Sequence, residues 1–262
     1  MNNILEVTEL SFSYAKDAPV LDRVSLRLQR GEVMMLMGPN GCGKTTLLKL
    51  ILRLLLSNSG QILIQGRPQG SYSTMELARE IAYVPQSSSN ANCDYSVREF
   101  LLMGRTPHIN LFQLPSQTDY QIAEKYAAEC GVVDLLDTSI SHLSGGQFQL
   151  VTIARALVQG SELIIMDEPL SALDLHNQAR MLKMLLKLQA QGKTVLLSTH
   201  DPNHALAIDC TVCGFLGRTI DFCGQASSVL TMERISAMYG DSIVIRECNR
   251  EKWIVFYNLL SS

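Results

Sequence analysis

The segment that most constrains the fold is residues 38–45, which read GPNGCGKT and fit the pattern GxxxxGK[ST]. A continuous apolar run, Val33 to Met37, precedes it, and leucines at helical spacing follow it as far as Leu55. Glycines let such a loop curl so that backbone N–H groups face phosphate oxygens, and a helix start adds a positive dipole end. The sequence therefore predicts a nucleotide-phosphate loop between a buried strand and a helix.

Three side chains of this segment have distinct expected roles. Lys44 can bridge the β- and γ-phosphates, Thr45 offers a hydroxyl to Mg²⁺, and Thr46 can contact the α-phosphate. Cys42 is interpreted either as a thiol whose alkylation inhibits ATP hydrolysis or as a small residue that fits the loop. The residues expected to bind nucleotide here are Gly38, Asn40, Gly41, Cys42, Gly43, Lys44, Thr45 and Thr46.

A second apolar run, Leu163 to Met166, ends in the two carboxylates Asp167 and Glu168. Asp167 is placed to hold Mg²⁺, and Glu168 can polarise an attacking water molecule. Alone, such a strand end is weak support for any chemistry. Together with the phosphate loop, it predicts nucleotide hydrolysis.

A second anion-receptive helix start lies just upstream, in residues 143–147, which read LSGGQ. The chain already has one loop for the γ-phosphate, so we interpret this second end as one that reaches ATP held by another copy of the chain. The alternative is a capped surface helix. The residues concerned are Ser144, Gly145, Gly146 and Gln147.

The order of expected elements indicates an α/β chain. Short apolar runs in residues 4–28, with a turn at 17–19, predict antiparallel strands, and later strands alternate with helices, which predicts a parallel sheet covered on both faces. Capping-box spacing at 96–99 and at 118–121 predicts helices in a mainly helical insert. Residues 87–93 are polar and predict a loop.

Composition narrows the classes of partner and compartment. The chain has 262 residues and a net charge of −3, so no basic excess points to nucleic acid. No run approaches the roughly 20 apolar residues that span a bilayer, and no signal pattern is present, so we expect a cytosolic chain. The seven cysteines, including Cys210, Cys213 and Cys223, are expected to be reduced thiols packed as small apolar groups rather than a zinc site.

Over about residues 4 to 230, the chain resembles the ABC ATPases, because the phosphate loop (Walker A), the LSGGQ signature and the acidic strand end (Walker B) occur in the order of that family. The resemblance implies that Gln86 senses Mg²⁺ and the membrane partner, that His200 is the switch histidine at the γ-phosphate, and that Tyr14 stacks on adenine. Alone, His200 would more often be structural and Tyr14 unremarkable. Phe148 departs from the polar residue usual after the signature.

This resemblance implies an α/β P-loop NTPase ABC ATPase fold, with a mainly parallel core sheet, an N-terminal antiparallel β subdomain and a helical subdomain insert. We expect one domain over residues 1–262. Its expected parts are a nucleotide-binding core at 1–86 and 160–219, a helical subdomain at 87–159 and a C-terminal tail at 220–262. The expected catalytic residues are Lys44, Gln86, Glu168 and His200, and those expected to hold Mg²⁺ are Thr45, Gln86 and Asp167.

Residues 95–99, 103–109 and 199–205 resemble ATPases of bacterial importers for metal chelates, which include iron-siderophore, haem, vitamin B12 and molybdate systems. The resemblance implies a homodimer with composite ATP sites, docked on permease subunits at the cytoplasmic face of the inner membrane and served indirectly by a periplasmic binding protein. Arg105 and His108 fit either a solvated loop face or a permease contact.

Other functions remain open at this stage. An exporter subunit differs from the importer only in direction, and a non-transport ATPase of repair or translation is a further alternative. A P-loop kinase is disfavoured by the Ser-Gly-Gly segment and His200. The transported substrate cannot be read from this chain, because the subunit need never touch it.

Overall fold

The computed structural model describes residues 3–15, 18–86, 94–110, 113–240, 243–248 and 251–256. They belong to two compact units, the first formed by Met1–Gln69 with Leu185–Ser262 and the second by Gly70–Met184. Helix α6 (Leu175–Ala190) passes from the second unit into the first. The predicted loop at 87–93 lies outside the described residues, and the predicted division into core, helical subdomain and tail stays a prediction.

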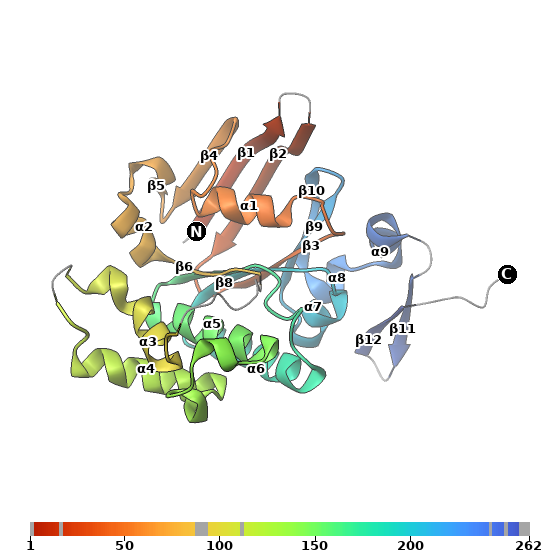
Figure 1. The fold of residues 1–262 in the computed structure, drawn as a ribbon. Helices are drawn as coiled ribbons and strands as arrows, with labels where there is room; N and C mark the ends of the chain where they lie inside the picture. Colours follow the sequence, from red (N-terminus) through yellow and green to blue (C-terminus); the bar gives the residue numbers. More distant parts are fainter. Residues whose placement is uncertain are drawn as a thin grey trace. The chain divides into compact units, whose positions relative to one another are not determined.

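An antiparallel sheet forms the N-terminal part of the first unit, as predicted (Figure 1). Its strand order is β2-β1-β4-β5. The strands are β1 (Asn3–Ala15), β2 (Ala18–Gln29), β4 (Ser59–Ile64) and β5 (Arg67–Pro68). In β2, buried and exposed side chains alternate from Val24 to Gln29, which is the pattern of a sheet with one solvated face. Strand β2 already begins at Ala18, within the turn predicted at residues 17–19, and Asp17 lies outside the described residues.

The same unit also contains a set of strands that run parallel to one another. Strand β3 (Val33–Met37) lies between β8 (Thr194–Thr199) and β9 (Thr211–Leu216) and runs parallel to both. Strand β10 (Thr219–Gln225) returns antiparallel to β9. Every residue of β3 and β8 is buried, which explains their continuous apolar or small side chains.

The remaining elements of the first unit are helices and a hairpin. Their bounds are α1 (Lys44–Ile51), α7 (Pro202–Ile208), α8 (Ala226–Val229), α9 (Met232–Tyr239), β11 (Ile243–Cys248) and β12 (Glu251–Phe256). Helix α1 ends earlier than its leucine spacing suggests. Arg53 adopts a left-handed conformation with φ 57°, and Leu54 and Leu56 are exposed, so nothing buries a longer apolar face there.

The second unit contains two parallel strands and most of the predicted helical insert. The strands are β6 (Ile81–Val84) and β7 (Leu163–Met166), and the helices are α2 (Thr74–Glu80), α3 (Val97–Leu102), α4 (Gln117–Cys130) and α5 (Gly145–Gln159). Helices α3, α4 and α5 pack on one another. The capping box at Ser96 and Glu99 is confirmed. The one predicted at 118–121 is wrong, because Ser116 and Asp119 form it instead.

Arg105 and His108 hold the C-terminal end of α5. Arg105 Nε donates to Asp119 Oδ1 at 2.8 Å and its Nη1 donates to Val158 O at 3.1 Å, while His108 Nε2 lies 2.8 Å from Gln159 O. The last carbonyls of a helix lack intrahelical partners and favour cations. Arg105 is thus part of the internal packing of the second unit rather than a solvated loop face.

The charge of Asp119 is strongly stabilised in this arrangement. Its hydrogen bond from the Ser116 hydroxyl, followed by that from Arg105, lowers the pKa of Asp119 to about 2. The carboxylate therefore stays ionised and can cap α4 and bind Arg105 at the same time.

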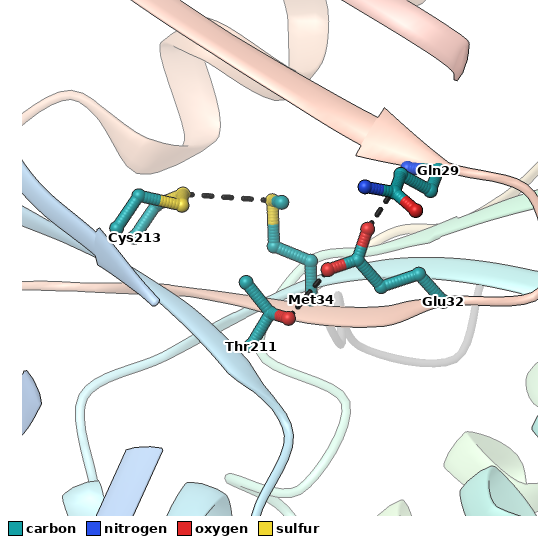
Figure 2. The surroundings of a disulfide bond; sticks show 6 residues. Gln29, Glu32, Met34, Thr211 and Cys213 are labelled. Atoms are coloured by element: carbon teal, nitrogen blue, oxygen red, sulfur yellow. Dashed lines mark hydrogen bonds between the residues drawn. A yellow bond between two sulfur atoms is a disulfide. The ribbon is translucent and has the colours of Figure 1, made fainter. Parts of the chain in front are cut away.

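The cysteines of the β9–β10 hairpin correct one expectation. Cys213 and Cys223 stand opposite each other in the strand register and form a disulfide, whose surroundings include Met34 Sδ at 3.6 Å from Cys213 Sγ (Figure 2). The prediction of reduced thiols is wrong for this pair. The register of the hairpin places Cys223 opposite Cys213, whereas the CxxC spacing directs attention to Cys210 and Cys213. Cys130 and Cys210 are thiols, and burial raises the pKa of each to about 12.

Among the described residues, none of the helices combines the length and the apolar character that a membrane crossing requires.

The disulfide predicts a redox-dependent stability. Cys223→Ser should lower the free energy of unfolding by about 2–3 kcal/mol, because a cross-link that closes a loop of 10 residues restricts the unfolded chain. Denaturant unfolding without reductant measures this loss. Reductant should destabilise the wild type by a similar amount and leave the variant unchanged. An equal response of both proteins to reductant would contradict the cross-link.

Candidate active site

The loop after β3 has the backbone conformation that its glycines predict. Gly38 has φ 154° and Gly43 has φ 108°, both in the range that favours glycine. A Cβ at Gly38 would lie 2.8 Å from Cys42 Sγ and 2.9 Å from Phe215 Cβ, and a Cβ at Gly43 would lie 2.6 Å from Leu21 Cδ2. Because α1 begins directly after Gly43, the first N–H groups of the helix open toward this loop.

Lys44 is almost completely buried, with 5% of its surface exposed. Its ammonium donates hydrogen bonds to Gly38 O at 2.7 Å and to Pro39 O at 3.1 Å. A buried charge needs such partners, and here they come from the loop itself. The cation is therefore held against the loop that is predicted to bind phosphate.

Tyr14 and Thr46 lie together in the first unit, as the predicted nucleotide site requires. The Tyr14 hydroxyl is 3.3 Å from Thr46 Oγ1, and the Tyr14 ring meets Phe12 edge to face at 4.9 Å. Tyr14 is nevertheless 62% exposed. Its position is thus fixed at one edge while a large part of the ring surface remains open for stacking.

His200 leaves the sheet beside the phosphate loop. Thr199 pairs with Met37 in the parallel register of β8 and β3, so His200 and Gly38 directly follow the ends of two adjacent strands. The carboxyl ends of parallel strands meet at one edge of a sheet, where ligands of open α/β folds bind. His200 is exposed at this edge.

Gln86 and Glu168 meet in the second unit for the same reason. Strands β6 and β7 pair Val84 with Met166, and each of the two residues follows its strand end by two positions. Gln86 Nε2 lies 3.5 Å from Glu168 Oε2. Parallel register thus places the amide next to the carboxylate that is predicted to act on water.

The backbone at Glu168 is strained and internally supported. Its φ is 46°, in the left-handed region, and its carbonyl accepts from Ser171 N at 3.2 Å and from Ser171 Oγ at 2.9 Å. Strained backbone of this kind clusters at functional sites.

Neighbouring Asp167 is 1% exposed, and its N–H donates to Val84 O at 2.9 Å. Burial, and then the charge of Asp167, raise the pKa of Tyr83 to about 12.

The signature residues begin α5 with a reciprocal cap. Ser144 Oγ accepts from Gln147 N at 3.3 Å, and Gln147 Oε1 accepts from Ser144 N at 2.9 Å. Ser144, Gly145 and Gln147 are exposed. The local geometry is therefore that of a capped helix whose N-terminus faces solvent, and the assignment of these residues to a second copy's ATP stays a prediction.

Phe148, the departure from the family pattern, packs inside the second unit. Its ring lies 5.8 Å from that of Phe100 in α3, and the Arg155 guanidinium lies 4.6 Å from the same Phe100 ring. The aromatic residue thus joins α5 to α3.

The residues predicted to hold Mg²⁺ have suitable chemistry. Thr45, Gln86 and Asp167 offer a hydroxyl, an amide oxygen and a carboxylate, which are hard oxygen ligands of the kind that Mg²⁺ accepts alongside substrate phosphates and water.

Sequence reasoning gave no role to His204, which the structure places against Thr199 and Asp201, on either side of His200. A signal was present in the sequence, because Asp201 and His204 are three residues apart, which is the spacing of neighbours on one face of a helix.

Comparison with known proteins gives concordant results. The sequence profile described as "ABC transporter" matches residues 21–171. A molybdate import ATP-binding protein of Haemophilus influenzae is 36% identical over 240 residues, covering 91% of this chain and 89% of that protein. An iron(3+)-hydroxamate import ATP-binding protein of Bacillus subtilis is 33% identical over 238 residues, covering 90% and 88%.

Solved structures agree with these sequence relatives. A metal-chelate type ABC transporter in an inward-facing conformation has a TM-score of 0.82 at 33% identity and covers 97% of both chains. An ATP-binding cassette of an ABC transporter in its ADP conformation has a TM-score of 0.76 at 25% identity, covering 89% of this chain and 98% of that one.

The geometry of the loop predicts that Lys44→Ala weakens ATP binding about 10- to 100-fold, because a charged hydrogen bond of about 1.5–3 kcal/mol is lost. Calorimetric titration with ATP measures the change. Lys49→Ala, near the other end of α1, is the matched control and should bind like the wild type. Unchanged affinity in the Lys44 variant would refute the loop as the phosphate site.

Proposed function

The chain belongs to the ABC transporter family, and on that premise we propose that this ATPase powers import of a metal chelate, such as an iron-siderophore, haem, vitamin B12 or molybdate, through a partner permease. The two relatives named for molybdate and iron(3+)-hydroxamate import support the direction of transport and the class of cargo. The observation that carries the ATPase activity in this proposal is the combination of a glycine-built phosphate loop with Glu168 beyond a buried strand.

The proposed hydrolysis uses residues of both units in separate roles. The loop N–H groups and Lys44 bind the phosphates, and Tyr14 stacks on adenine. Glu168 orients the attacking water and accepts its proton, while Gln86 holds the carboxylate through the 3.5 Å contact. His200 contacts the γ-phosphate. Bound Mg²⁺ would supply charge neutralisation at the β- and γ-phosphates.

We further propose that two copies share two ATP molecules head to tail. Ser144 to Gln147 provide a second solvent-facing helix N-terminus, which suits an anion. Because the chain's own loop already binds the phosphates of one ATP, this second N-terminus is available for the ATP bound by the other copy. ATP would then join the copies, and loss of the γ-phosphate would release them.

A groove in the second unit is the proposed docking site for the permease. It has a volume of about 470 Å³ and lies within the segment between α2 and α4. Its lining includes Met75, Met103 and Tyr120, which are 48%, 38% and 38% exposed. Flexible methionines and aromatic rings suit an apolar helix laid into a groove. The chain would therefore act on the cytoplasmic face of the bacterial inner membrane, with a periplasmic binding protein contributing indirectly.

Glu168→Gln tests the water-activating role and the shared site together. The amide keeps the shape of the side chain but cannot accept a proton, so ATP should bind while hydrolysis falls at least 100-fold, within the range for general-base loss. Light scattering with ATP should then show a stalled dimer. Glu162→Gln, exposed just before β7, is the control. Normal turnover by the Glu168 variant would remove the assigned base.

Met103→Glu tests the docking groove. A buried charge without a partner is costly, so the variant should no longer retain transmembrane subunits when the tagged chain is purified from detergent-solubilised membranes. ATP binding by the isolated variant should remain unchanged. Met232→Glu is matched in residue type and exposure, 39% against 38%, and should retain the subunits. Equal retention by both variants would exclude the groove.

A further inference from the structure

A single side chain contacts both neighbours of His200. His204, in the first turn of α7, places Nδ1 at 3.1 Å from Thr199 Oγ1 and Nε2 at 3.7 Å from Asp201 Oδ2. Thr199 ends β8, and Asp201 caps α7. His204 therefore links the strand before the exposed histidine to the helix after it.

The turn around His200 is closed by further hydrogen bonds. Asp201 N donates to Thr199 Oγ1 at 3.1 Å, which bridges the two neighbours of His200 directly. Asp201 Oδ1 accepts from Asn203 N at 2.8 Å, and His204 N donates to Asp201 O at 3.3 Å. Thr199 is only 4% exposed and is paired with Met37 in the sheet. The turn is thereby anchored to the strand that leads into the phosphate loop.

The protonation of His204 suits this linking role. Burial lowers the pKa of His204, Asp201 opposes that effect, and the nearby His200 adds to it, so the net shift favours the neutral ring. The Asp201 carboxylate beside Nε2 favours a proton on that nitrogen. Nδ1, at 3.1 Å, is then the nearer acceptor for the Thr199 hydroxyl proton, compared with Asp201 O at 3.5 Å, and the hydroxyl lone pairs accept from Asp201 N.

We propose that His204 is a positioning residue for His200, which it holds at the edge of the phosphate loop through its hydrogen bond to Thr199, whose hydroxyl also accepts from Asp201 N. The inference rests on the proposed role of His200 in ATP hydrolysis. His200 is exposed, and the geometry of this turn sets the direction in which its side chain leaves the backbone. A displacement of about 1 Å in catalytic geometry costs up to about 100-fold in rate, so a small relaxation of this turn is enough to matter.

Steady-state hydrolysis by the full chain tests this role. His204→Ala should lower kcat between about 10- and 100-fold. The KM for ATP should change less than about threefold, because the phosphate loop is intact. His204→Asn can place an amide oxygen where Nδ1 stands and should recover most of the rate. His204→Gln, whose amide is one carbon farther out, should not.

A double-mutant cycle separates positioning from general stability. In a His200→Ala background, His204→Ala should cause no further loss of kcat, because the residue it positions is already absent. Thr199→Val keeps the shape of the side chain but removes the hydroxyl, and it should reproduce the His204→Ala defect. This variant tests the link even where His204→Ala is too unstable to assay.

The possible outcomes are distinguishable. Full activity of His200→Ala would remove the proposed role of His200 and this inference with it. A defective His200→Ala with a fully active His204→Ala would overturn the inference alone. Equal losses from His204→Ala in both backgrounds, or equal activity of the Asn and Gln variants, would also overturn it, since both results describe a structural histidine.

Discussion

The parallel pairing of β3 with β8, and of β6 with β7, is the constraint on which the chemistry of this protein depends. In each pair, two fully or largely buried strands run in parallel, so the residues that follow their ends lie side by side. One pair delivers the phosphate loop and His200, and the other delivers Gln86 and Glu168. A slip of one residue would turn every side chain of a strand to the opposite face, so the buried apolar runs determine where the polar groups appear.

The helical part of the second unit depends on satisfied helix ends. The N-terminus of α5 is capped by Ser144 and Gln147, and its C-terminus receives hydrogen bonds from Arg105 and His108. Polar groups left without partners at buried helix ends are costly, so such contacts fix where a helix starts and stops. The signature residues thus sit on a helix that is held at both ends.

Much of the fold was predictable because its signals are local. The apolar run of β3 and the cap at Ser96 each act within a few residues, and both predictions are confirmed; the glycines of the loop adopt the positive φ angles that such a turn needs. The cap of α4 was misplaced, because Thr118 and Ser116 carry similar signals; Asp119, which completes the box with Ser116, also accepts a hydrogen bond from the distant Arg105.

Features that depend on distant residues were not predictable in the same way. The disulfide partner of Cys213 follows from the hairpin register, and the role of Arg105 follows from the end of α5, more than fifty residues later. Among the site residues, local patterns identified those with family motifs. His204 was missed, because its proposed role depends on its contacts with Thr199 and Asp201, the two residues beside His200.

The cap of the signature helix has a consequence for ligand recognition. Ser144 accepts the Gln147 N–H through a lone pair of its oxygen, and that bond does not use the hydroxyl proton. The same serine can therefore hold the helix start and still donate to an incoming oxyanion. Recognition would need no rearrangement of the cap, so the entropy of ordering this surface is lost when the chain folds and not again when an oxyanion binds.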